Sequence, residues 1–245
     1  MIKVLTLASM KEEYSHTLFG FLWLLLRPAL MVLAIVATFY FRAGEIGVAS
    51  YALTVTYGVV IWNAMSGIVN RMTELVYSKK QVFLKTTLPR EVISLIPVGR
   101  IMVDFLFGFC FIILAHFFLL QVPSVTSLGF LLSATILGAL ISYGIGLLIS
   151  ILSVYFRDLR YFVSHVMRIL FFVTPIFLLE FPEGILTKTL FFNPFSLAII
   201  MGRSGEYLQQ DLLHVSLALI VWTIVLVPVG IWFYGRKIHD VVDIV

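Results

Sequence analysis

The sequence predicts an all-α membrane protein that crosses the bilayer six times, with an interfacial helix at its N-terminus and short re-entrant helices before the last span. Apolar residues make up 61% of the 245 residues and charged residues only 12%, about half the charge share of a soluble domain. The connections between the apolar runs are short, so we expect a single membrane domain over residues 1–245. Runs long enough to cross a bilayer cover residues 22–41, 51–70, 93–120, 128–153, 161–180 and 213–234.

Residues 1–20 precede the first span. Apolar residues dominate positions 4–10 and charged residues follow at 11–13, which predicts a helix lying along the membrane surface. A disordered tail is the alternative. This stretch has no apolar core followed by small residues, so we expect no cleaved signal peptide. Arg27, beside Pro28, is expected to anchor the start of the first span at the membrane boundary.

Residues 71–90 form a basic and aromatic connection between the second and third spans. Apolar residues at 75–76 and 82–84 predict a short amphipathic helix, and Pro89 ends any helix here. Such a helix could dock in a groove of a cytoplasmic protein. A basic loop touching anionic lipid is the alternative.

The third and fifth spans carry charged residues. Arg100 and Asp104 are four residues apart, so we expect them to pair on one helix face and relieve the cost of burial. Arg168 lies two turns into the fifth span, one turn after His165. The sequence leaves open whether Arg168 extends toward the membrane surface or faces a polar pathway.

The fourth span carries small residues at every fourth position, which on a helix form one stripe. This pattern predicts the close approach of another helix, and leaves open whether that helix belongs to the same subunit. The stripe consists of Ala134, Gly138, Ser142, Gly146 and Ser150.

The region 181–205 contains an apolar patch that Pro182, Gly184, Pro194 and Gly202 interrupt. The patch is too short to span the bilayer, and non-helical backbone at membrane depth must be buried in protein or line a wet cavity. We therefore predict a re-entrant or interfacial element.

Basic residues set the predicted orientation. Residues 71–90 carry five of them and 154–162 add Arg157 and Arg160, whereas the opposite connections carry few. The positive-inside rule places the basic side in the cytoplasm, and an even number of spans places both termini there too. The net charge of +4 is explained in this way, and no nucleic-acid partner is expected.

The sequence predicts neither an enzyme nor a cofactor or metal site. The histidines lack metal-ligand spacing, and the motifs G-x-S-x-G and G-x-x-x-x-G-K-[ST] are absent. Energy for uphill transport must therefore come from an ion gradient or another polypeptide. Ion coupling is disfavoured because Asp104, the one acid within a span, lies near the cytoplasmic end.

Five motifs then resemble the permease subunits of ABC-2 type polysaccharide exporters, in order and over nearly the whole chain. The motifs are TLFGFLWLLLRP (17–28), FLKTTLPREVI (83–93), YFRDLRYF (155–162), FFVTPIF (171–177) and FFNPFS (191–196). The resemblance implies an ABC-2 type fold and a homodimer in the inner (cytoplasmic) membrane. It also implies two copies of a separate ABC ATPase subunit, which would hold the ATP and Mg²⁺.

The resemblance also implies roles for individual residues. Residues 73–88 would form the coupling helix and 181–205 the re-entrant, extracytoplasmic region. ATPase contacts would be Glu74, Tyr77, Lys79, Lys80, Phe83, Arg157 and Asp158; the substrate would enter beside Phe19, Gly20, Trp23 and Arg27; Pro175 and Pro194 would bracket the re-entrant gate.

The implied function is a channel-forming permease that moves a lipid-linked polysaccharide of the O-antigen, teichoic acid or capsule type. Two alternatives stay open at this point: an ABC-2 exporter of a small molecule or lipid, and a membrane enzyme acting on a polyprenyl lipid.

Overall fold

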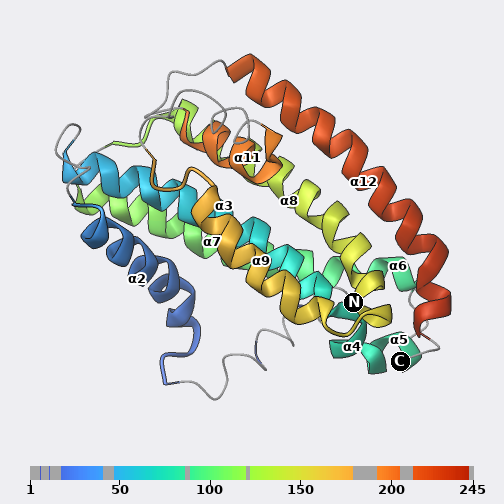
Figure 1. Cartoon of the computed structure of the whole chain (residues 1–245). Coiled ribbons are helices and arrows are strands. Elements are labelled where there is room, and N and C mark those ends of the chain that lie inside the picture. The colour runs from blue at the N-terminus through green and yellow to red at the C-terminus, as the bar shows by residue number, and fades with distance from the viewer. Residues whose placement is uncertain are drawn as a thin grey trace.

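A computed structural model describes residues 18–40, 47–85, 89–119, 122–178, 192–204 and 212–242, together with Thr6 and Lys11. Within these ranges the regular secondary structure is helical, and the long helices run alongside one another as a bundle (Figure 1). The elements are η1 (Gly20–Leu22), α2 (Trp23–Thr38), α3 (Val48–Thr73), α4 (Leu75–Ser78), α5 (Lys80–Lys85), α6 (Arg90–Ile93), α7 (Leu95–Phe118), α8 (Val125–Tyr155), α9 (Leu159–Val173), α11 (Pro194–Arg203) and α12 (Leu212–Val242).

Five segments of the described chain are long and apolar enough to cross a membrane, which confirms the prediction of a multi-pass, all-α membrane protein. Helix α9 covers the predicted run 161–180 only as far as Val173. With 15 residues, α9 is about 22 Å long, shorter than the hydrocarbon core. Thr174 is extended (ψ 148°), as expected for a residue before proline, so α9 ends there. The five spanning segments are Gly20–Thr38, Val48–Thr73, Arg90–Phe118, Val125–Tyr155 and Leu212–Val241.

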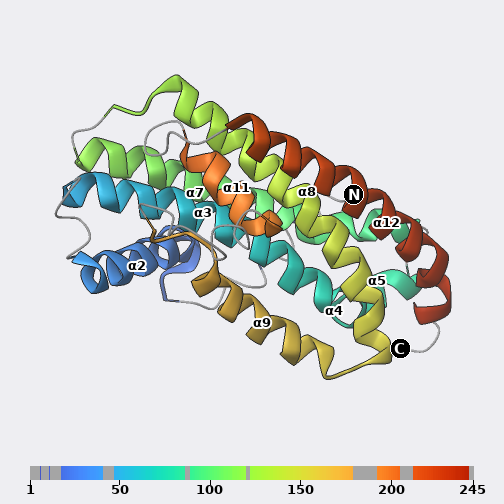
Figure 2. The same ribbon diagram turned by 45° about the horizontal axis from the view of Figure 1, so that its top comes forward.

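Helix α3 lies at the centre of the bundle. It contacts α2, α7, α8, α9 and α11, and most of its side chains are buried. Helix α12 lies on the outside, where it packs along α8 (Figure 2). Its other face exposes apolar side chains. These exposed side chains suit contact with lipid.

The small-residue stripe of α8 packs against α3 of the same chain, which answers the question that the sequence left open. A Cβ atom at Gly138 would lie 2.8 Å from the Met65 sulfur, and one at Gly146 would lie 2.7 Å from Met72. Ala134, at the other end of the stripe, contacts Gly202 of α11. The stripe therefore joins α8 to the core of its own subunit.

Three predicted functional segments, 1–20, 73–88 and 181–205, fall partly outside the described residues. Of 1–20, the structure describes Thr6, Lys11 and Leu18 to Gly20. Thr6 is buried beside Gly99 of α7, where a Cβ atom would lie 3.1 Å from its hydroxyl oxygen. Of 181–205, it describes 192–204, which contain the ten-residue helix α11.

Candidate functional site

The connection between α3 and α7 forms an amphipathic surface at one end of the bundle. The predicted helix over 73–88 is divided, within the described residues, into the short helices α4 and α5. Leu75, Val76 and Phe83 point into the core and are at most 5% exposed. Within residues 74–85 the exposed side chains are those of Glu74, Ser78, Lys80, Gln81, Leu84 and Lys85.

The turn between α8 and α9 is fastened to this connection. The Tyr77 hydroxyl donates a hydrogen bond to the Val154 carbonyl oxygen (3.5 Å), and the Arg160 guanidinium carbon lies 4.2 Å from the centre of the Tyr77 ring. The Ser153 hydroxyl donates to the Thr73 carbonyl oxygen (2.8 Å). The two segments predicted to contact an ATPase thus lie side by side, and we call them together the loop-end surface (residues 74–85 and 155–160).

The predicted contact residues divide between the two faces of this surface. Glu74, Lys80, Arg157 and Asp158 are exposed and Lys79 is partly exposed. Phe83 is 5% exposed in this chain, so it supports the surface from within. Arg160 was not among the predicted ATPase contacts. Its role depends on the position of the Tyr77 ring, which the sequence alone does not give.

A polar groove lies next to α3, away from the loop-end surface. Asn63, Ser66 and Asn70 are at positions i, i+3 and i+7 of α3, so they share one face. These three residues, which we call the polar row, line one hollow, and Ser66 and Asn70 also line a second hollow that adjoins it. One hollow, of about 260 Å³, lies between α2, α3 and α7, and the other, of about 470 Å³, lies between α2, α3 and α9.

Charged residues line the first hollow. Arg27 of α2, Arg71 of α3 and Asp104 of α7 face it. Asp104 forms the predicted ion pair with Arg100, a side chain that is only 2% exposed. The predicted ion pair is therefore confirmed, and it holds the Asp104 carboxylate of α7 beside the hollow.

Aromatic residues and one cation line the second hollow. Trp62 of α3 and Phe171 and Phe172 of α9 surround it, and Arg168 faces it. The Trp62 and Phe171 ring centres are 5.7 Å apart. Arg168 is exposed and lines this hollow, a position that agrees with both alternatives that the sequence left open. The polar row itself was missed, although its spacing is visible within the apolar sequence 58–72.

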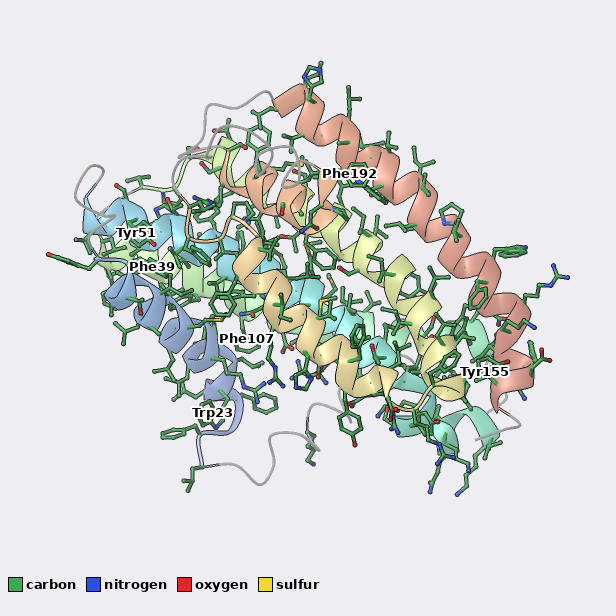
Figure 3. The ribbon with its side chains drawn as sticks, in the orientation of Figure 1. Trp23, Phe39, Tyr51, Phe107, Tyr155 and Phe192 are labelled. Atoms are coloured by element: carbon green, nitrogen blue, oxygen red, sulfur yellow. The ribbon has the colours of Figure 1, made fainter. Side chains whose placement is uncertain are left out.

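The residues predicted to lie where the substrate enters stand at the start of α2. Gly20 has a positive φ of 50°, which glycine adopts without the steric penalty of other residues. The Phe19 and Trp23 rings meet edge to face with centres 5.6 Å apart, and Trp23 marks this end of α2 in Figure 3. Arg27 follows one turn later and lines the first hollow.

Arg203, a residue that the sequence did not single out, joins the segment of one predicted gate proline to the helix that begins at the other. Pro175 follows α9, and Pro194 opens α11, where Asn193 caps the helix by accepting from the Phe195 amide (3.0 Å). Arg203 at the end of α11 donates to the carbonyl oxygens of Pro175 and Leu178.

Arg203 is 1% exposed. Burial lowers the pKa of its guanidinium group to about 10, so at neutral pH the group still carries a positive charge. The carbonyl oxygens around it therefore stabilise a buried cation. Within the described residues, no three His, Cys, Asp or Glu side chains come together as a metal site.

Comparisons with known proteins identify the family of the chain. The model of a family described as ABC-2 type transporter matches residues 1–207. A protein named O-antigen export system permease protein RfbA, from Klebsiella pneumoniae, is 24% identical over 243 residues, covering 96% of this chain and 91% of that protein. A second protein of the same name and organism is 28% identical over 180 residues, covering 72% and 68% of the two chains.

Proposed function

The chain belongs to the ABC-2 type transporter family, and we propose that it is the channel-forming permease subunit of an ATP-driven exporter of a lipid-linked polysaccharide. Permeases of this family pair with ABC ATPase subunits. We propose a homodimer with two ATPase copies, which hold the ATP and Mg²⁺, and with both termini in the cytoplasm. The polymer would be of the O-antigen, teichoic acid or capsule type, and the names of the two relatives favour O-antigen.

The polar row on α3 is the observation that carries this proposal. Polar side chains within a membrane helix are costly unless they are buried with partners or line a wet path. Asn63 is exposed and Asn70 partly exposed in the single chain, and Asn70 lines the second hollow together with aromatic rings. Amides can hydrogen-bond sugar hydroxyl groups, and aromatic rings can stack on the apolar faces of sugar rings.

Two such grooves facing each other across a homodimer axis would enclose a passage lined by polar and aromatic groups. Substrate would enter beside Phe19, Gly20, Trp23 and Arg27, where the first hollow opens next to α2. Pro175 and Pro194 flank the segment that would close the opposite end. The ATPase would dock on the loop-end surface through Glu74, Lys79, Lys80, Arg157 and Asp158, with Tyr77 and Phe83 supporting that surface.

Replacing the polar row tests the passage. The double variant Asn63→Leu/Asn70→Leu is expected to lower export about tenfold or more, since sugar hydroxyl groups that lose their partners cost 1–3 kcal/mol each. Surface polysaccharide would be measured in cells whose only copy is the variant, together with ATP hydrolysis by the purified complex. Hydrolysis is expected to continue.

A matched control is Thr223→Leu on the outer helix α12, where a polar side chain is also replaced by leucine away from the groove. Export by this control should equal that of the wild type. Normal export by the Asn63→Leu/Asn70→Leu variant would contradict a passage along α3.

Charge reversal on the loop-end surface tests ATPase docking. Deleting 73–88 would remove buried Leu75, Val76 and Phe83. A loss of ATPase binding would then not distinguish a docking defect from a folding defect. The double variant Lys80→Glu/Lys85→Glu changes only exposed side chains. We expect it to weaken co-purification with the ABC ATPase about tenfold, because like charges facing each other across an interface disfavour binding.

The control for docking is Val122→Glu, which adds an acidic side chain just before the opposite end of α8, where the side chain is 92% exposed. It should bind the ATPase as the wild type does. Undiminished binding by Lys80→Glu/Lys85→Glu would show that the ATPase does not dock on the loop-end surface.

A further inference from the structure

Helix α9 is held along its length by a narrow row of contacts. Its buried residues are Val163, Met167 and Phe171, which are four residues apart and form a single edge of the helix. The remaining side chains are partly or fully exposed. A helix with so small a packed edge moves as a rigid body more readily than the buried α3, so the contacts at its two ends decide what it moves with.

The end of α9 near the loop-end surface is fastened by Arg160. This residue lies in the first turn of α9, and its guanidinium carbon stands 4.2 Å from the centre of the Tyr77 ring of α4. Tyr77 also donates to Val154 at the end of α8. A cation over an aromatic face is attracted by the ring, so α9 begins in contact with the segment that joins α3 to α5.

The other end of α9 is fastened by Arg203. Beyond Val173 the chain continues through Thr174 to Leu178 without forming a helix. The Arg203 guanidinium donates to the carbonyl oxygens of Pro175, Ile176 (3.4 Å) and Leu178 (2.7 Å). A planar guanidinium has several donors in a fixed fork, which lysine lacks. It can therefore hold α11 to the segment that follows α9.

We propose that α9 is a strut that makes α11 move with α4, and that Arg160 and Arg203 are the positioning residues that fasten its two ends. A displacement of α4 would pass through the Tyr77 ring to Arg160, along the rigid helix, and through the carbonyl oxygens of 175–178 to Arg203 and α11. This inference rests on the proposed function, because it assigns α4 to the driven end and α11 to the gate. Coupling of this kind is reciprocal, so a change at α11 would also be felt at Tyr77.

The strut can be tested in the purified permease without any ATPase. Hydrogen exchange would be measured for the amides of 174–178 and 196–204 in wild type, Arg160→Met and Arg203→Met. In Arg160→Met the start of α9 is released from the Tyr77 ring. This release should speed amide exchange at 196–204 by about fivefold or more, the lower end of usual coupling strengths. Arg157→Met is the matched control, since Arg157 lies in the same turn and is exposed; it should leave that exchange unchanged.

A cross-link shows whether the effect passes through Arg203. Tyr77→Cys/Arg160→Cys, in a Cys110→Ser background, would be joined by a short thiol-reactive linker. Joining the two cysteines should slow exchange at 196–204 by about fivefold relative to the unlinked protein when Arg203 is present. With Arg203→Lys, or Arg203→Met if it folds, the linker should have no effect there. An equal effect with and without Arg203, or none in either, would overturn the proposal.

Export by the complex with the ATPase provides the functional readout. Arg160→Met is expected to lower export per ATP hydrolysed by the same complex about fivefold or more. Dividing export by ATP hydrolysis separates this loss from any change in ATPase docking, because Arg160 lies within the loop-end surface. Arg160→Lys should restore part of the export, because an ammonium group also binds an aromatic face. Wild-type export by Arg160→Met would overturn the strut. Failure of the wild-type chain to bind any ABC ATPase would instead contradict the proposed function, and the exchange experiment would still report on α9.

Discussion

Gly144→Ala is expected to prevent the observed packing of α8 against α12 and to lower the free energy of unfolding by about 2–3 kcal/mol, as overpacking does in other cores. A Cβ atom at Gly144 would lie 2.5 Å from the Leu226 carbonyl oxygen, and one at Gly230 would lie 2.4 Å from the Gly144 carbonyl oxygen. Both neighbours are backbone atoms that cannot rotate away, so one helix must shift. Gly230→Ala should therefore have a similar effect.

The same two helices supply matched controls. A Cβ atom at Gly129 of α8 or Gly235 of α12 meets nothing within 4 Å. Gly129→Ala and Gly235→Ala should keep or raise the stability, by up to about 1 kcal/mol, because alanine is the better helix former. Unfolding of the four variants in one detergent would be compared. Equal stability of Gly144→Ala and Gly129→Ala would show that α8 and α12 do not approach as closely as described.

Asp104→Ala is expected to destabilise the protein by about 3 kcal/mol, the lower end of the cost of breaking a buried ion pair, because Arg100 is buried whereas Asp104 is 27% exposed. The Arg100 guanidinium donates to the Asp104 carboxylate while its side chain is only 2% exposed. Removing the carboxylate leaves a buried positive charge without this partner, in surroundings where a charge is costly. The free energy of unfolding in detergent would measure the loss.

Removing both charges separates burial of a charge from packing. Arg100→Met/Asp104→Leu should recover most of the stability that Asp104→Ala loses, since replacing a whole buried pair with apolar groups is often neutral. A loss below about 1 kcal/mol in Asp104→Ala would indicate that Arg100 reaches water or another acceptor. A double variant no more stable than Asp104→Ala would indicate that shape, and not charge, makes the site sensitive.

Several features could be predicted from the sequence because they depend on neighbouring residues. The apolar runs identify spans by length, and five of the six are found as long helices. The spacing of Arg100 and Asp104 along one helix predicts their ion pair, which the structure contains. Pro175 ends α9 early because the residue before a proline avoids the helical conformation, yet the run 161–180 concealed this because its apolar character continues beyond the helix.

The sequence by itself determined the class of protein and the number of apolar runs, since both follow from local composition. Only the tertiary structure decided which helix faces the stripe of α8, that the polar row borders a groove, and that Arg160 and Arg203 fasten α9. Each of these depends on contacts between residues far apart in the chain. Such contacts are set by how whole helices pack, and short-range sequence patterns do not record that arrangement.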